Sequence, residues 1–158
     1  MDRSDGTLIV MLWVARCDGP LSRFEIAHLL SSCLKHQQAA LFAGRLEACL
    51  RRLSTLQPEE LIEALRAMSE GPSIEELKRQ LAYAVGLAMV DVRAGVVGGQ
   101  SNVLPAAAVH VLRMLADALS GGEHGMEWFT EACRKVGVRV PLAGDLSSPS
   151  WWMSHDAP

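Results

Sequence analysis

The sequence predicts an all-α protein: one compact bundle of about seven helices, built from two similar helical hairpins and followed by an extended C-terminal tail. Apolar residues recur at helical spacing nearly throughout, and no stretch alternates between apolar and polar residues as a strand would. Capping residues, glycines and prolines divide this pattern into segments of helix length. The 158 residues, 49% hydrophobic and 21% charged, suit a single domain with one core.

Start and stop signals place the expected helices in order. The segments cover about 7–17, 22–35, 37–53, 58–70, 73–90, 102–119 and 123–136. Two of them open with a capping box, in which a serine cap is followed three residues later by a glutamate: Ser22 with Glu25, and Ser73 with Glu76. The first ends at Asp18-Gly19, a good turn pair. A glycine-bearing loop separates the fifth from the sixth.

The two halves of the chain resemble each other faintly. A shift of 76 residues places Gly19 on Gly95 and Glu25 on Ser101, and both copies consist of an apolar helix, a glycine-bearing loop and another apolar helix. This pattern indicates two similar hairpins packed together.

The domain is expected to span residues 1–137, and residues 138–158 to form the tail, which contains three prolines and no period. The tail carries Trp151 and Trp152 side by side. Adjacent tryptophans on a polar tail require burial. They dock either into a groove of the same molecule or onto a protein partner or a second copy of the chain, because tryptophan is favoured at interface hot spots.

Composition narrows the class of protein. The net charge of −3 and the pI near 5.9 argue against nucleic acid as a partner, since phosphate binding needs a concentrated basic face. No segment reaches membrane-spanning length, and the N-terminus is a poor signal peptide. The cysteines form no C-x-x-C pair, which favours a reduced, cytoplasmic protein; they are Cys17, Cys33, Cys49 and Cys133.

The first hairpin carries a family likeness. Its pattern is a helix with A-x-x-D-G, a small apolar residue, a cap, and a glutamate seven residues after the aspartate; the residues are Ala15, Asp18, Gly19, Leu21 and Glu25. This pattern in an all-helical chain resembles the TerB-like family, which includes bacterial tellurite-resistance proteins and the N-terminal domain of a membrane co-chaperone. The likeness spans about residues 7–136.

The resemblance implies a helical bundle with an acidic site between the hairpins, and a role in stress responses or as an accessory module beside other domains. The family's acidic-site residues correspond directly to Asp18 and Glu25 in the first hairpin. The family's second acidic pair falls on Ala94 and Ser101, neither of which is acidic, and Asp91, one helical turn earlier, is the candidate substitute. The metal hypothesis is therefore weak Ca²⁺ or Mg²⁺ binding by Asp18, Glu25 and Asp91, because these cations prefer oxygen ligands.

Two functions stay open at this point. The first is a non-enzymatic TerB-like interaction module, in which Asp18 and Glu25 form a cation site or only a turn and a cap. The alternative is a small-ligand binder or small enzyme that uses polar groups inside the bundle. That alternative requires inward-facing polar clusters, and the direction of His28, His110 and Asp91 distinguishes the two.

Overall fold

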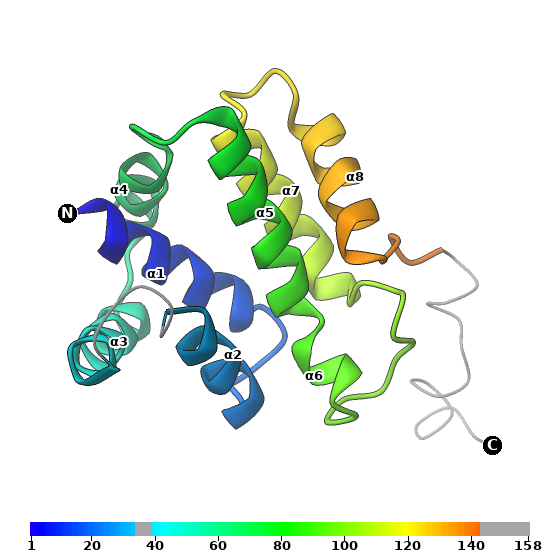
Figure 1. The fold of residues 1–158 in the computed structure, drawn as a ribbon, viewed down its shortest axis with the longest axis horizontal. Helices are drawn as coiled ribbons and strands as arrows, with labels where there is room; N and C mark the ends of the chain where they lie inside the picture. Colours follow the sequence, from blue (N-terminus) through cyan, green and yellow to red (C-terminus); the bar gives the residue numbers. More distant parts are fainter. Residues whose placement is uncertain (34–38, 143–158) are drawn as a thin grey trace.

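In a computed structural model, the chain is described over residues 1–33 and 39–142, with side chains over 1–31 and 44–142. The all-α prediction is confirmed (Figure 1). The helices of the described residues are α1 (Arg3–Ala15), α2 (Arg23–Cys33), α3 (Ala39–Ser54), α4 (Pro58–Ser69), α5 (Ile74–Ala88), α6 (Val90–Arg93), α7 (Ala106–Leu119) and α8 (Gly125–Val136). None of them is long and apolar enough to cross a membrane.

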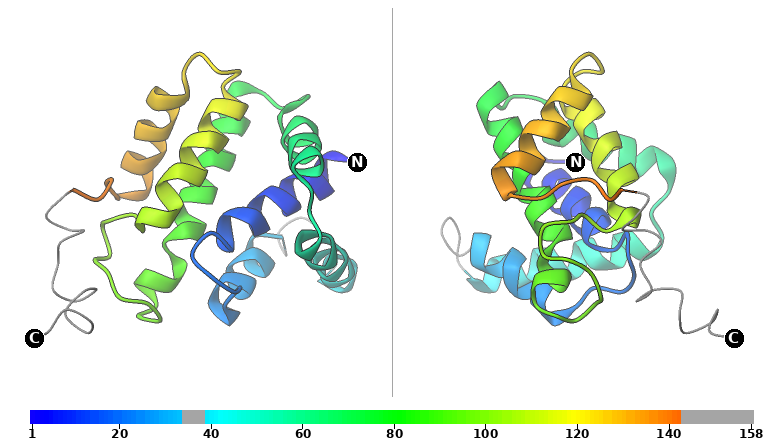
Figure 2. Two further views of the ribbon diagram at one scale, coloured as in Figure 1. Left: turned by 180° about the vertical axis from the view of Figure 1, so that it is seen from behind. Right: turned by 90° about the vertical axis from the view of Figure 1, so that its right-hand side faces the viewer.

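Helix α1 is the centre of the first half. It packs most extensively on α4 and also contacts α3 and α5. Helices α5, α7 and α8 pack on one another, and the view from behind shows them as a group beside α1 (Figure 2, left). Helix α2 reaches the second half mainly through the short α6. The first hairpin therefore meets the second half where α1 packs against α5 and α7, and where α2 packs against α6.

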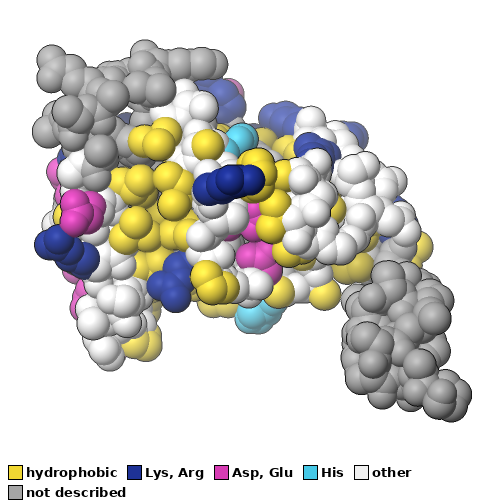
Figure 3. All heavy atoms as spheres, turned by 90° about the horizontal axis from the view of Figure 1, so that it is seen from below, with side chains coloured by type: hydrophobic (Ala, Val, Ile, Leu, Met, Phe, Trp, Pro, Cys, Tyr) yellow, Lys and Arg dark blue, Asp and Glu magenta, His cyan; other side chains and the backbone are white. Residues whose placement is uncertain are grey.

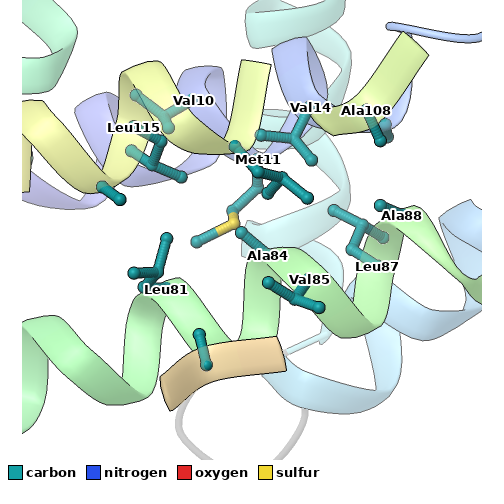
Figure 4. Packing of buried hydrophobic residues seen from close by; sticks show 14 of the residues in the cluster. Val10, Met11, Val14, Leu81, Ala84, Val85, Leu87, Ala88, Ala108 and Leu115 are labelled. Atoms are coloured by element: carbon teal, nitrogen blue, oxygen red, sulfur yellow. The ribbon is translucent and has the colours of Figure 1, made fainter. Parts of the chain in front are cut away.

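The core forms where α1 crosses α5 and α7 (Figure 4). Helix α1 is apolar on nearly all sides, and most of its residues are buried. Met11 points between α5 and α7, toward Leu81 and Leu115, and Ala84 keeps the helices close. Burial of such side chains contributes on the order of 1.5–3 kcal/mol each. This apolar crossing fixes the relative position of the two hairpins.

The expected sixth helix starts later than its sequence pattern indicates. We predict it from about residue 102, but α7 begins after Pro105. Residues Asn102 and Leu104 instead bond to the segment that follows α8: the Arg139 amide donates to the Asn102 carbonyl, and the Leu104 amide donates to the Arg139 carbonyl, both at 2.9 Å. A long-range pairing thus removes the first turn of the predicted helix.

The boundary at residue 138 falls close to the end of α8. Gly137 ends this helix with a φ of 80°, in the left-handed conformation that suits glycine. Val138 is nevertheless buried, so the first residues of the expected tail pack on the domain. Trp151 and Trp152 lie outside the described residues, and their role stays a prediction.

Candidate acidic site

The turn between α1 and α2 begins the site. Helix α1 ends at Ala15, and Gly19 follows with a φ of 140°, which a side chain would disfavour. The capping box is formed as predicted: the Glu25 amide donates to Ser22 Oγ at 3.1 Å, and the Ser22 amide donates to Glu25 Oε1 at 3.0 Å. The cap therefore fixes the position of the Glu25 carboxyl group at the start of α2.

Asp91, from the other half of the chain, reaches this same cap. It lies in α6, and the Ser22 hydroxyl donates to its Oδ1 at 2.5 Å. Ser22 thus accepts a bond from the backbone of its own helix and donates one to a carboxylate 69 residues away in the sequence. This contact places the carboxyl groups of Glu25 and Asp91 near each other, where α2 meets α6.

The two carboxyl groups differ from Asp18 in exposure. Glu25 is 2% exposed and Asp91 is 6% exposed, whereas Asp18 lies at the surface. Burial, together with the nearby charges of Asp91 and Asp18, raises the pKa of Glu25 to about 7. The hydrogen bond that the Ser22 amide donates acts in the opposite direction. Partial burial and the charge of Asp91 also raise the pKa of Asp18. All three groups therefore belong to one electrostatic cluster.

The cluster has no positive partner in the part of the chain that the structure describes. No Lys, Arg or His side chain there pairs with Asp18, Glu25 or Asp91. Buried carboxylates without a cation are costly, so a proton or a bound cation would each relieve the cluster. Over the same residues, no group of three or more His, Cys, Asp or Glu side chains is arranged to hold a metal ion.

The two positions that the resemblance pairs with the first hairpin's acids, Ala94 and Ser101, carry no acidic group. Ala94 caps the end of α6, and Ser101 is exposed in the following loop. Arg93 holds this loop in place, because its guanidinium donates to the carbonyls of Ser101 and Val136 at 3.1 Å each. Asp91 is thus the acidic residue of the second half that meets Glu25.

His28 and His110 do not join the site. His28 in α2 stacks on Tyr83 of α5, with ring centroids 5.2 Å apart, and burial lowers its pKa. His110 is exposed on α7, whereas Asp91 is buried against α2. These three side chains therefore do not converge on one cavity, as an enzyme or small-ligand site built on them would require.

The Cys17 and Cys133 thiols and the basic residues of α3 give no sign of a second reactive or anion-binding site. Burial raises the pKa of the Cys17 and Cys133 thiols to about 11 each, which is opposite to the change that would activate a nucleophile. The basic cluster of α3 forms ion pairs, which are those of Arg45 with Asp2 and Asp5, Arg51 with Glu47, and Arg52 with Glu60. The sequence groups Asp18, Glu25 and Asp91 as candidates, and their role as a site stays a prediction. The bond from Ser22 to Asp91 could not be read from the sequence, because only tertiary packing creates it.

No family model, no curated protein and no solved structure matches the chain.

Proposed function

We propose that the chain is a non-enzymatic, TerB-like helical interaction module with a weak divalent-cation site at Asp18, Glu25 and Asp91. The observation that carries the proposal is the meeting of two buried carboxyl groups, Glu25 and Asp91, at the contact between the two hairpins. A site at this contact couples ligand binding to the way the hairpins pack. Such coupling suits a module that acts through protein contacts.

The donor set explains why the cation site would be weak. Ca²⁺ takes six or more oxygen ligands, and the three carboxyl groups are not gathered closely enough in this structure to hold a cation as a set. Two of their oxygens already accept bonds from Ser22, one from its hydroxyl and one from its amide. A cation must therefore compete with Ser22, and at neutral pH also with the proton that the raised pKa of Glu25 retains. We expect a Kd on the order of 0.1–1 mM, as in weak extracellular calcium modules.

An apolar surface supports the interaction role. Figure 3 shows hydrophobic side chains gathered in a hollow of the lower face, on the side where α1 and α3 lie, with acidic side chains near the centre of the same face. Large apolar patches on a protein surface commonly mark interaction sites. The tryptophans of the tail, Trp151 and Trp152, are a second candidate partner surface.

Thermal unfolding tests the cation site. The chelator-treated protein is melted at pH 8 with and without about 5 mM Ca²⁺ or Mg²⁺, an excess that stabilises by roughly 1–2 kcal/mol at the expected affinity. We expect the melting temperature to rise by about 3–6 °C. The Glu25→Gln variant should lose this rise, because the amide can still complete the capping box but carries no charge.

The matched control is Glu76→Gln, in the exposed capping segment of α5. It removes one carboxylate from the surface and should leave the cation-dependent rise intact. An equal rise in wild type and Glu25→Gln would place cation binding elsewhere. No rise in the wild type would reduce the Asp18–Glu25 motif to a turn and a cap, and leave partner binding to the apolar surfaces.

A further inference from the structure

The chain leaves the described fold beside the start of α7. After α8, the segment that ends at Leu142 runs parallel to the one that precedes α7, and Val103 pairs with Arg139. Two backbone hydrogen bonds of 2.9 Å hold this pairing. Because the two segments run in the same direction, the chain reaches Leu142 near the first turn of α7, as the side view shows (Figure 2, right). The pairing therefore fixes the place from which residues 143–158 continue.

Helix α7 carries an apolar strip on its outward side, which we call the α7 strip. It consists of Ala107, Val111, Met114 and Ala118, which follow one another at steps of four and three residues and so lie on one side of the helix. Val111 is half-buried and the other three are exposed. Met114, the largest of them, is 44% exposed. The α7 strip is therefore an apolar helix face that the described residues leave open.

Residues 143–158 carry large apolar side chains that can reach this strip. Trp151 follows Leu142 by nine residues, which an extended chain spans over about 30 Å. Met114 follows Ala106, the first residue of α7, by eight residues, which is about 12 Å along the helix axis. A tether of this length keeps the tryptophan at an effective concentration on the order of millimolar near the strip. A contact too weak to hold two separate molecules together is therefore populated within one chain.

The charges of the two segments are complementary. Residues 143–158 contain two aspartates and neither Lys nor Arg. Arg113 and His110 are exposed on the outward side of α7, and neither forms an ion pair with an acidic side chain of the described residues. The carboxyl group of Asp117 lies against Gly125, at the start of α8. Exposed ion pairs contribute little free energy, so these charges orient the segment while apolar contact holds it.

We propose that residues 143–158 dock back on their own domain, with Trp151 and Trp152 packed on the α7 strip. Docking removes the apolar surface of both indole rings and of the strip from water. The tryptophans then reach a protein partner only when they leave α7. This docking does not depend on the cation site, and it is measured with chelator present.

Nuclear magnetic resonance of the full chain tests the docking. Amide spectra of the wild type are compared with those of a variant that carries both Trp151→Ala and Trp152→Ala. We expect the resonances of the α7 strip to shift and those of α5 to stay in place, because an aromatic ring changes the local field of the groups that it covers. Unchanged α7 resonances, or changes confined to other helices, would overturn the proposal.

The reciprocal variant is Met114→Asp, which places a charge in the middle of the strip. Its side chain is exposed, so the fold should tolerate the change. We expect the indole N–H groups of Trp151 and Trp152 to become more accessible to a soluble paramagnetic gadolinium chelate. The matched control is Met126→Asp, at a methionine of α8 that is 53% exposed, and it should leave both indoles as protected as in the wild type.

A dilution series separates docking within one chain from contact between two copies. Docking within the chain predicts that the α7 resonances of the wild type keep their positions as the protein is diluted. If they move on dilution toward the positions of the double tryptophan variant, the tryptophans bind a second copy, and docking within the chain is wrong. Equal indole accessibility in the wild type, Met114→Asp and Met126→Asp would also contradict the proposal, because the strip would then play no part in covering the tryptophans.

Discussion

The α1–α2 hairpin and helix α5 share two sequence features that lie in opposite surroundings. Each has a serine–glutamate capping segment, Ser22 with Glu25 and Ser73 with Glu76. Each also has a glycine inside a helix, Gly6 in α1 and Gly86 in α5. In the hairpin, the glutamate is buried and the serine bonds to Asp91 of another helix. At α5 the capping serine is exposed.

The cap of α5 shows what the motif does on its own. The Glu76 amide donates to Ser73 Oγ at 3.2 Å, and the Glu76 side chain pairs with Arg79 and Gln80 of its own helix. Every one of these contacts is local. The comparison teaches that spacing decides where a helix starts, whereas packing decides whether the same residues become part of a site.

The two caps should differ most in how the stability of the folded protein depends on pH. The pKa of Glu25 in the folded protein is about 7, above its ordinary value of 4.5, so folding favours the protonated form. This stabilisation is complete below pH 4.5 and is lost as the pH rises through 7. The difference corresponds to roughly 3 kcal/mol, and Asp18, whose pKa is also raised, acts in the same direction.

Denaturant unfolding between pH 4.5 and 8 measures this loss. We expect the free energy of unfolding of the wild type to fall across this range, and that of Glu25→Gln to fall much less, because the amide does not ionise. Glu76→Gln should keep the wild-type slope. Parallel slopes in wild type and Glu25→Gln would show that Glu25 is not the titrating group.

The next effect comes from the glycine inside α1. A Cβ on Gly6 of α1 would lie 2.8 Å from the Ala64 carbonyl oxygen and 2.9 Å from the Ala67 Cβ, both in α4. Gly6→Ala therefore forces the α1 and α4 backbones apart, and we expect it to lower the free energy of unfolding by about 1–3 kcal/mol. Chemical denaturation measures this loss. An unchanged midpoint would mean that α4 moves aside without cost.

The caps and the core could be predicted from the sequence, because both follow from residue spacing along one helix. The spacing of Ser22 and Glu25 predicted their mutual bonds, and Asp91 was identified as the substitute acid through the family resemblance. The hydroxyl bond from Ser22 to Asp91 was not predictable, since it joins residues 69 positions apart. For the same reason the predicted helix start at residue 102 was wrong: Leu104 pairs with Arg139, far along the chain.

The smallest expected effect is a gain in the free energy of unfolding, opposite in sign to the loss expected for Gly6→Ala. Gly86 lies inside α5, and nothing lies within 4 Å of the place where its Cβ would be. An alanine there fits without a clash and restricts the unfolded chain, so Gly86→Ala should raise the free energy of unfolding by about 0.5–1 kcal/mol. Urea denaturation of Gly6→Ala and Gly86→Ala side by side checks the opposite signs. A loss of stability in Gly86→Ala would mean that the open face of α5 is occupied in solution, and would direct the search for a partner surface to that helix.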